Sequence, residues 1–293
     1  MCWSFEVSVL FAVVEAASIG FLYHRANNSA NPYVKAQVLV LPLLSSILLV
    51  ESVEALLWLD TTLTSVKAKD GPTCSTYNTS LTMLFWIFVF ALQPLLCIIP
   101  CRRVGHPRNR DLFAAVELIA IVLPIIHMLV YLGQVIPQMM NPNFKMQPPR
   151  QNVQRHAYQT FINSETCTYI GPNGHLFWTL ATADCWFTPN ASCYAIICMS
   201  LFYCKPKRFF AGIALFMCAV FLGLNTYFGG NIETASMWCW TGILMNIYFV
   251  VQPYVLPCND KNSFSPNTHP NYVAGDTLIP YFGLPVKQLS KGS

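Results

Sequence analysis

Long apolar segments constrain this chain more than any other feature of its sequence. Between Phe5 and Leu256 one apolar stretch follows another, and short polar loops separate them. A helix needs about 20 mostly apolar residues to cross the hydrocarbon core of a bilayer. Several stretches reach that length, so the pattern predicts an integral membrane protein with the lipid bilayer as a partner.

The composition agrees with this prediction and argues against several other classes of protein. Of the 293 residues, 54% are hydrophobic and only 10% are charged, whereas soluble domains carry about 25% charged residues. The net charge of +4 is small and concentrated in a few loops, which does not favour a nucleic-acid partner. The twelve cysteines lie mostly in apolar segments and form no CxxC pair, so no such motif indicates a metal centre or a cofactor.

Seven apolar segments predict an all-α polytopic fold with about seven transmembrane helices. Residues 1-256 would form this domain, and the polar tail 257-293, rich in Pro and Asn, would be flexible. The fifth segment contains Asp184 and Pro189, so it could instead be an interfacial helix that leads into a short span. The predicted spans are Phe5–Tyr23, Ala36–Leu59, Ser80–Pro100, Leu112–Val135, Ala183–Cys204, Phe209–Phe228 and Ala235–Leu256.

The basic residues predict the orientation of these spans. With seven spans, the short loops 24–35, 101–111 and 205–208 share one side with the C-terminal tail, and they hold most of the Lys and Arg. Lys and Arg in short loops stay in the cytoplasm. We therefore expect the N-terminus outside or in a lumen and the C-terminus in the cytoplasm.

This orientation places Cys74 and Cys167 in the two main outer loops, on the oxidising side of the membrane. A disulfide between them would pin the long loop 136–175 onto the bundle. Two free thiols are the alternative, because pairing cannot be deduced from sequence alone. Asn78 is the one glycosylation sequon that faces this side, but it lies close to the membrane and no glycan is expected there.

Ionisable residues inside the spans indicate function more directly, because such groups are costly in a bilayer and usually face the bundle interior. Glu51 and Glu54 are three residues apart and share one helix face. Two carboxylates on one buried face repel each other unless they share a proton or a cation. The ionisable residues in the spans are Glu15, Glu51, Glu54, Glu117, His127 and Asp184.

The orientation gathers several of these groups toward the outer side and predicts an outward-facing polar pocket. Such a pocket could bind a small ligand or ion, or relay protons. Alternatively, each group only hydrogen-bonds across helices and holds the bundle together. The residues expected to line the pocket are Glu51, Glu54, Gln93, His127, His175, Glu233 and Trp238.

A series of short motifs extends along most of the chain up to Leu256. They are Met1–Ser4, Glu54-Ala55-Leu56, Gln93-Pro94, then Cys167, Gly171, His175 and Trp178, and finally Asn231, Glu233 and Trp238-Cys239. In this order they resemble an uncharacterised multi-pass membrane family, a domain of unknown function whose members begin Met-Cys-Trp-Ser. One departure is that Asn173-Gly174 precede His175, where the family pattern has Trp. The resemblance implies a seven-helix membrane protein and brings no known activity.

Three hypotheses about function remain open at this point. The first is a membrane protein that handles a small ligand or ion, as a transporter, a channel or a receptor-like bundle. The second is an intramembrane metal-dependent hydrolase, which would need about three His or a His and carboxylate set around zinc. Only His127 and His175 lie near the expected pocket and no helical HxxxH is present, which counts against an enzyme. The third is a structural membrane protein whose polar residues only pack helices, and no catalytic residue is assigned.

Overall fold

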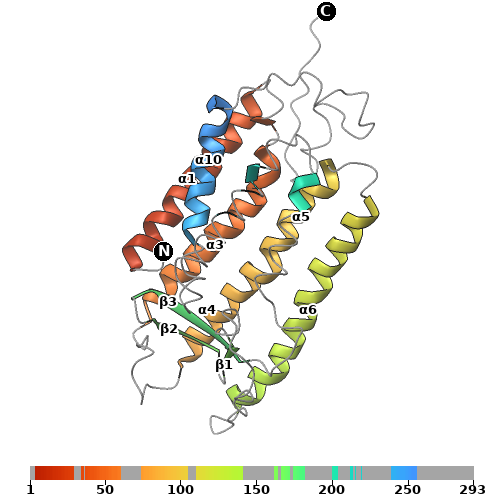
Figure 1. The fold of residues 1–293 in the computed structure, drawn as a ribbon. Coiled ribbons are helices and arrows are strands. Elements are labelled where there is room, and N and C mark those ends of the chain that lie inside the picture. The colour runs from red at the N-terminus through yellow and green to blue at the C-terminus, as the bar shows by residue number, and fades with distance from the viewer. Residues whose placement is uncertain are drawn as a thin grey trace, which may run out of the picture.

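In the computed structural model the described part of the chain is mostly helical, with one small sheet (Figure 1). The residues it describes are 4–29, 34–35, 37–60, 74–104, 110–140, 162–163, 166–171, 174–181, 200–203, 212–213, 215, 219 and 239–255. The helical elements are α1 (Phe5–Asn28), η1 (Gln37–Val40), α3 (Leu41–Trp58), α4 (Thr76–Ile87), η2 (Phe88–Leu92), α5 (Gln93–Val104), α6 (Arg110–Met140), η5 (Ser200–Tyr203) and α10 (Cys239–Val255).

Among the described residues, two helical segments are long and apolar enough to cross a membrane, namely α1 and the segment Gln37–Trp58, each with a mean hydropathy of 1.9. The side chain of Ser4 caps α1 by accepting a hydrogen bond from the Val7 N–H, which satisfies one of the open donors of the first turn. The helix continues to Asn28, five residues beyond the end predicted at Tyr23. The sequence therefore located this segment correctly but predicted its end too early.

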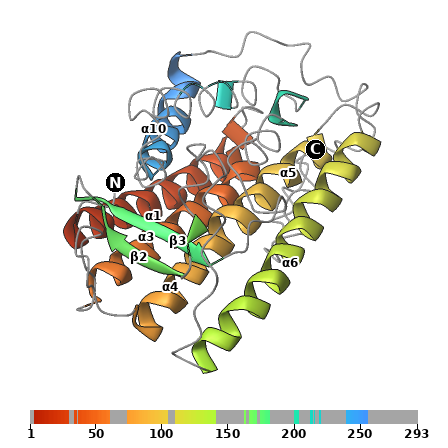
Figure 2. The same cartoon turned by 60° about the horizontal axis from the view of Figure 1, so that its bottom comes forward.

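Helices α1, α3 and α10 pack together along one side of the bundle, where Figures 1 and 2 show them side by side. Arg25 of α1 hydrogen-bonds both Gln37, at the start of the second segment, and Phe249, near the end of α10. Glu15 lies beside Ile47 and Gly242. Glu15 precedes Arg25 on α1. Its neighbour on α10, Gly242, likewise precedes Phe249, whereas its neighbour in the second segment, Ile47, comes after Gln37. Thus α10 runs parallel to α1, and α3 runs antiparallel to both.

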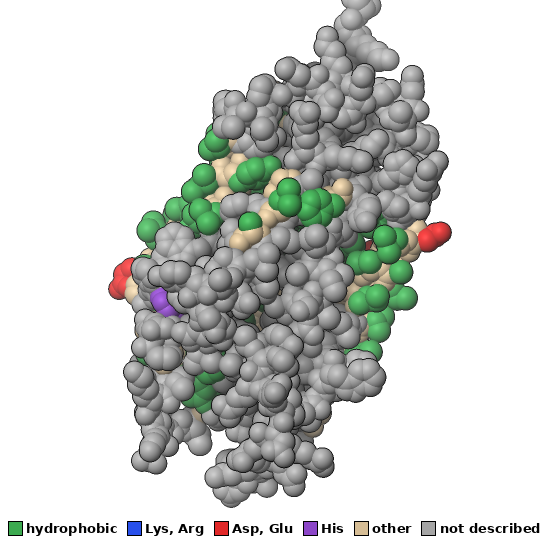
Figure 3. Space-filling model, in the orientation of Figure 1, with side chains coloured by type: hydrophobic (Ala, Val, Ile, Leu, Met, Phe, Trp, Pro, Cys, Tyr) green, Lys and Arg blue, Asp and Glu red, His purple; other side chains and the backbone are tan. Residues whose placement is uncertain are grey.

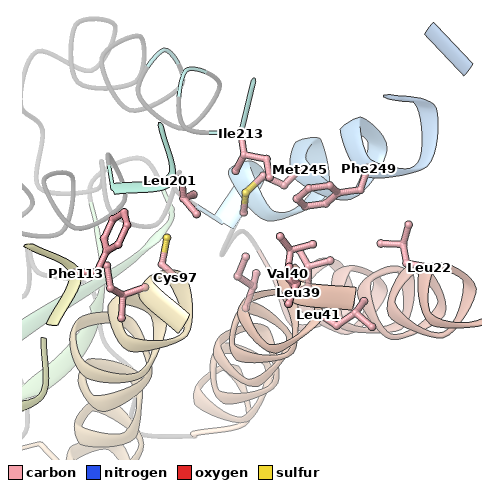
Figure 4. Close-up of a cluster of buried hydrophobic side chains, with 13 residues drawn as sticks. Leu22, Leu39, Val40, Leu41, Cys97, Phe113, Leu201, Ile213, Met245 and Phe249 are labelled. Carbon is pink, nitrogen blue, oxygen red and sulfur yellow. The ribbon is translucent and has the colours of Figure 1, made fainter. Parts of the chain in front are cut away.

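An apolar cluster joins these three helices to the rest of the bundle. Met245 and Phe249 of α10 point toward Leu22 of α1 and Val40 of η1 (Figure 4). The cluster continues to α5 and α6 through Cys97, Ile98 and Phe113, all of which are buried. Burial of this apolar surface is what fixes α10 against the first two helical segments.

The third predicted span forms a helix that is interrupted at its centre. Ser75 caps α4, so the helix begins at Thr76, four residues before the predicted Ser80. Between α4 and α5 the segment η2 is π-helical, and the Gln93 N–H donates to the Phe88 carbonyl. Pro94 has no N–H to donate, which removes one ordinary helical hydrogen bond beside this segment. The next helix, α6, runs past the predicted end at Val135 to Met140.

The prediction of an all-α fold was wrong in the segment after α6. Strands β1 (Ile162–Asn163), β2 (Cys167–Ile170) and β3 (Leu176–Ala181) form a three-stranded sheet in the order β1-β3-β2. The antiparallel β2–β3 hairpin is closed by a Gly171 N–H to His175 carbonyl bond of 2.7 Å. β-Branched and aromatic residues favour strands here, but the segments are too short for periodicity to distinguish them from loops.

Several predictions lie outside the described residues. These are most of the fifth and sixth spans (Ala183–Cys204 and Phe209–Phe228), the tail 257-293, and the residues Asp184, Glu233 and Trp238. The last predicted span, Ala235–Leu256, contains α10, which begins at Cys239 and ends at Val255.

Candidate functional site

The sheet is tied to the start of α4, and we call β1, β2, β3 and the first turns of α4 the cap. Cys74 and Cys167 are joined by a disulfide, with their Cα atoms 5.8 Å apart. Next to it, the Asn78 amide donates to the Thr168 carbonyl (3.0 Å) and accepts from the Thr168 N–H (2.7 Å). Asn78 is 1% exposed, so this sequon serves as a hydrogen-bonding partner of β2.

The cap covers the end of the bundle where α3 ends and α4 begins (Figures 1 and 2). Leu176 and Trp178 of β3 belong to the same buried cluster as Val53 and Leu57 of α3. The Trp178 ring stacks on Phe85 of α4, with centroids 4.1 Å apart and planes at 8°. His175, which precedes β3, is buried in this cap.

Beneath the cap, three carboxyl groups are buried on neighbouring helices. Glu51 and Glu54 of α3 are both 0% exposed, and Glu15 of α1 is 1% exposed. Because α3 is antiparallel to α1 and Ile47 lies level with Glu15, Glu51 and Glu54 follow one and two turns nearer the start of α1. By this register all three carboxyl groups lie within about two helical turns of one another along α1 and α3.

Glu15 sits where three helices meet. A Cβ added to Gly242 of α10 would overlap the Glu15 carboxyl and would lie 2.7 Å from Cγ2 of Ile47. The carboxyl thus packs directly against the backbone of α10, and any larger residue at this position would have to displace the side chains of Glu15 and Ile47. Within the part of the chain that the structure describes, neither Glu15 oxygen has a hydrogen-bond partner.

Two further polar side chains lie buried on the same three helices. Asn246, one turn beyond Gly242 on α10, is 2% exposed, and neither its amide nitrogen nor its oxygen has a partner among the described residues. Ser8, two turns before Glu15 on α1, is fully buried, and its hydroxyl likewise lacks a partner within those residues. Buried polar groups normally have a hydrogen-bond partner in protein or water, so this interface calls for a polar partner from outside the described chain.

At the opposite end of α1, a cation closes the interface. The Arg25 guanidinium donates to the carbonyls of Phe249 (2.7 Å) and Val250 (2.8 Å), and the Gln37 amide also donates to Phe249 (2.7 Å). The Phe249 carbonyl would ordinarily accept from the residue four positions later, but that residue is Pro253, which has no N–H. Arg25 and Gln37 therefore replace a missing helical hydrogen bond.

The predicted pocket residues divide into three groups. Glu51 and Glu54 lie together on the buried face of α3. Gln93 is buried on α5 and His175 is buried in the cap, each on a different element from the two carboxylates. The His127 side chain, Glu233 and Trp238 lie outside what the structure describes.

Sequence reasoning missed part of this site. The sequence pattern shows Glu15 as an ionisable residue in a span but does not place it in the pocket, and neither Gly242 nor Asn246 is among the ionisable residues that it singles out. Their spacing of four residues in an apolar helix was the available signal, because a small and a polar residue then share one face. Among the described residues, no three His, Cys, Asp or Glu side chains are grouped so that they could hold a metal ion.

Comparison with known proteins identifies one distant relative of nearly equal length. The chain is 22% identical over 259 residues to "Uncharacterized protein R287" of Acanthamoeba polyphaga mimivirus, covering 87% of this chain and 96% of that protein. No protein-family model and no solved structure matches the chain. The name of the relative gives no activity, so the function has to be argued from the site.

Proposed function

We propose that this chain is a multi-pass membrane protein that handles a small ligand or ion at a buried polar site, as a transporter, a channel or a receptor-like bundle. About seven spans, with the N-terminus outside and the C-terminus cytoplasmic, follow from the apolar segments and the basic loops. A tag placed after Ser293 that becomes labelled only in permeabilised cells would check this orientation.

The outer faces of the helices support a lipid environment. Only 22% of the apolar window of α1 is buried, and its exposed residues include Leu10 and Val13. On α6, which has 31 residues, Leu118 and Leu129 are similarly exposed. On the face shown in Figure 3, most of the described side chains that reach the surface are hydrophobic. Water-soluble monomers rarely expose contiguous apolar patches larger than a few hundred Å². Exposed apolar residues along two long helices therefore favour contact with lipid.

The burial of Glu15, Glu51 and Glu54 carries the functional part of the proposal. Ionisable groups in apolar helices are costly and usually belong to a pathway for ions, protons or substrates. Three carboxyl groups on two adjacent helices cannot all be ionised at low cost, so they favour binding of a proton, a cation or a basic ligand. A metal-dependent hydrolase is less well supported, because no group of three metal ligands occurs in the described part of the chain.

The test uses purified protein and a panel of ions and small polar solutes, with the melting temperature as the readout. A solute that binds the native state raises the melting temperature. We expect at least one solute to do so in the wild type and to have no effect on Glu54→Gln, which keeps the shape of the side chain and removes its charge.

Glu54→Leu serves as the matched control, because it removes the hydrogen-bonding atoms as well as the charge. If Glu54→Gln lowers the yield of folded protein as much as Glu54→Leu, and no solute shifts the wild type, Glu54 is a structural hydrogen-bonding residue. That result would leave the third hypothesis, a structural membrane protein.

A further inference from the structure

We propose that the interface of α1, α3 and α10 carries protons, with Glu15 as the central proton-binding group. The inference rests on the proposed function and narrows its ligand to the proton. It follows from three observations: the order of the buried polar groups along the three helices, the close packing around Glu15, and the lack of a partner among the described residues for Ser8 on one side of Glu15 and Asn246 on the other.

The polar groups extend along the interface in steps of one or two helical turns. Ser8 lies toward the start of α1, Glu54 of the antiparallel α3 lies at about the same level, and Glu51 lies between that level and Glu15. Beyond Glu15, Asn246 follows Gly242 by one turn of α10, about 6 Å along the helix axis. The carbonyls that bind Arg25 come one turn after Asn246. From Ser8 to Arg25 is about 26 Å along α1, close to the roughly 30 Å of a hydrocarbon core.

The unpaired atoms indicate where water would complete this path. The hydroxyl of Ser8 and both polar atoms of the Asn246 amide are buried with no partner in the described chain. Buried water typically bonds such atoms. Water held by Ser8 on one side and by Asn246 on the other would connect the carboxyl groups to the two ends of the interface.

The packing around Glu15 favours a proton over a larger cation. The backbone of α10 at Gly242 lies directly against the carboxyl, and Ile47 closes the site from α3. A hydrated cation needs several oxygen ligands around it, and the described residues contain no group of three acidic or other metal-binding side chains. A proton needs only one carboxylate oxygen.

Each step is a reversible acid–base exchange that needs no other reactant. A Glu15 carboxylate oxygen takes a proton from a hydronium ion, which leaves a carboxylic acid and a water molecule, and the reverse step returns the proton to a water on the other side. The titratable or charged residues on the described helices that pack together at Glu15 include Glu51 and Glu54 on α3, Tyr248 on α10, and Glu6, Tyr23, His24 and Arg25 on α1. Arg25 lies at the far end of the interface, about 15 Å from Glu15 along α1.

The experiment measures proton flux into phospholipid vesicles that contain the purified full-length protein and a pH-sensitive dye, driven by a potassium diffusion potential. We expect wild-type flux above that of protein-free vesicles, and a decrease of about 100-fold in Glu15→Gln, as for loss of a proton-transfer group. Glu6→Gln is the matched control, since Glu6 lies exposed in the first turn of the same helix and its loss should not change the flux.

Asn246→Leu separates conduction from folding. It removes the unpaired amide, so we expect a melting temperature at or above that of the wild type together with a reduced flux. Wild-type flux equal to that of protein-free vesicles, or full flux in a folded Glu15→Gln variant, would overturn the inference. In either case a solute that stabilises the wild type but not Glu54→Gln would still uphold the proposed function, so the two proposals can fail separately.

Discussion

Two buried asparagines show how differently the cap and the three-helix interface are built. Asn78 in the cap is 1% exposed, and its amide forms two hydrogen bonds with the backbone of Thr168. Asn246 in the interface is 2% exposed, and neither end of its amide has a partner among the described residues. Two asparagines of similar burial thus differ in their hydrogen bonding. The Asn78 amide is paired with β2, whereas the Asn246 amide has no partner among the described residues.

The contrast indicates that the two regions serve different purposes. A paired buried amide contributes to stability, whereas an unpaired one costs the free energy of removing it from water. In the cap, the disulfide, the amide pair and the Phe85–Trp178 stack all hold β2 and β3 onto α4 or the segment just before it. In the interface, Glu15 and Asn246 lower stability unless something binds them, which is expected of a site for ions or protons.

The largest expected effect is the loss of the disulfide in the cap. The bridge closes a loop with a sequence separation of 93 residues, for which the chain-entropy model gives about 4–5 kcal/mol of stability. Reduction should therefore lower the melting temperature of the wild type, measured in detergent with and without reductant. In the double variant Cys74→Ser/Cys167→Ser the reductant should have no effect. An unchanged melting temperature after complete reduction would show that the cap does not depend on its bridge.

Replacing the two asparagines tests the comparison itself. Asn78→Leu should destabilise the protein by about 2–4 kcal/mol, because the buried N–H and carbonyl of Thr168 both lose their partner. Asn246→Leu should leave the free energy of unfolding unchanged or increase it, since it removes, at similar volume, two polar atoms that have no partner among the described residues. Denaturant unfolding of both variants in one detergent gives the two values. Equal destabilisation would mean that Asn246 has protein partners after all.

The smallest expected effect concerns two glycines in helices of the same interface. Gly242→Ala places a methyl group against Glu15 and Ile47, and overpacking of this kind costs about 1–3 kcal/mol. Gly20→Ala on α1 meets nothing within 4 Å, so it should stabilise the helix by about 0.5–1 kcal/mol. Thermal unfolding distinguishes the opposite signs. If both variants are stabilised, the carboxyl of Glu15 does not pack against α10 as described.

Helix positions followed from the sequence with moderate error, because apolar segment length is a local property. The long apolar runs located α1, α3 and α10, whereas the ends at Asn28 and Met140 depended on the polar residues that continue each helix. The cap sheet was not predicted, because the four residues of β2 carry too little periodicity to outweigh the expectation of a loop. Its strands gain their stability from Phe85, Leu57 and the disulfide.

The site was predictable where it depended on one helix and unpredictable where it depended on three. Glu51 and Glu54 share a face because of the helical repeat, which the sequence alone determines, as it does the apolar character and the low charge of the chain. That Glu15 lies beside Gly242 and Ile47, and that Asn246 extends the same polar line, was decided by tertiary packing. The crossing of α1, α3 and α10 is set by the summed burial of apolar residues far apart in the chain, and no local pattern contains that information.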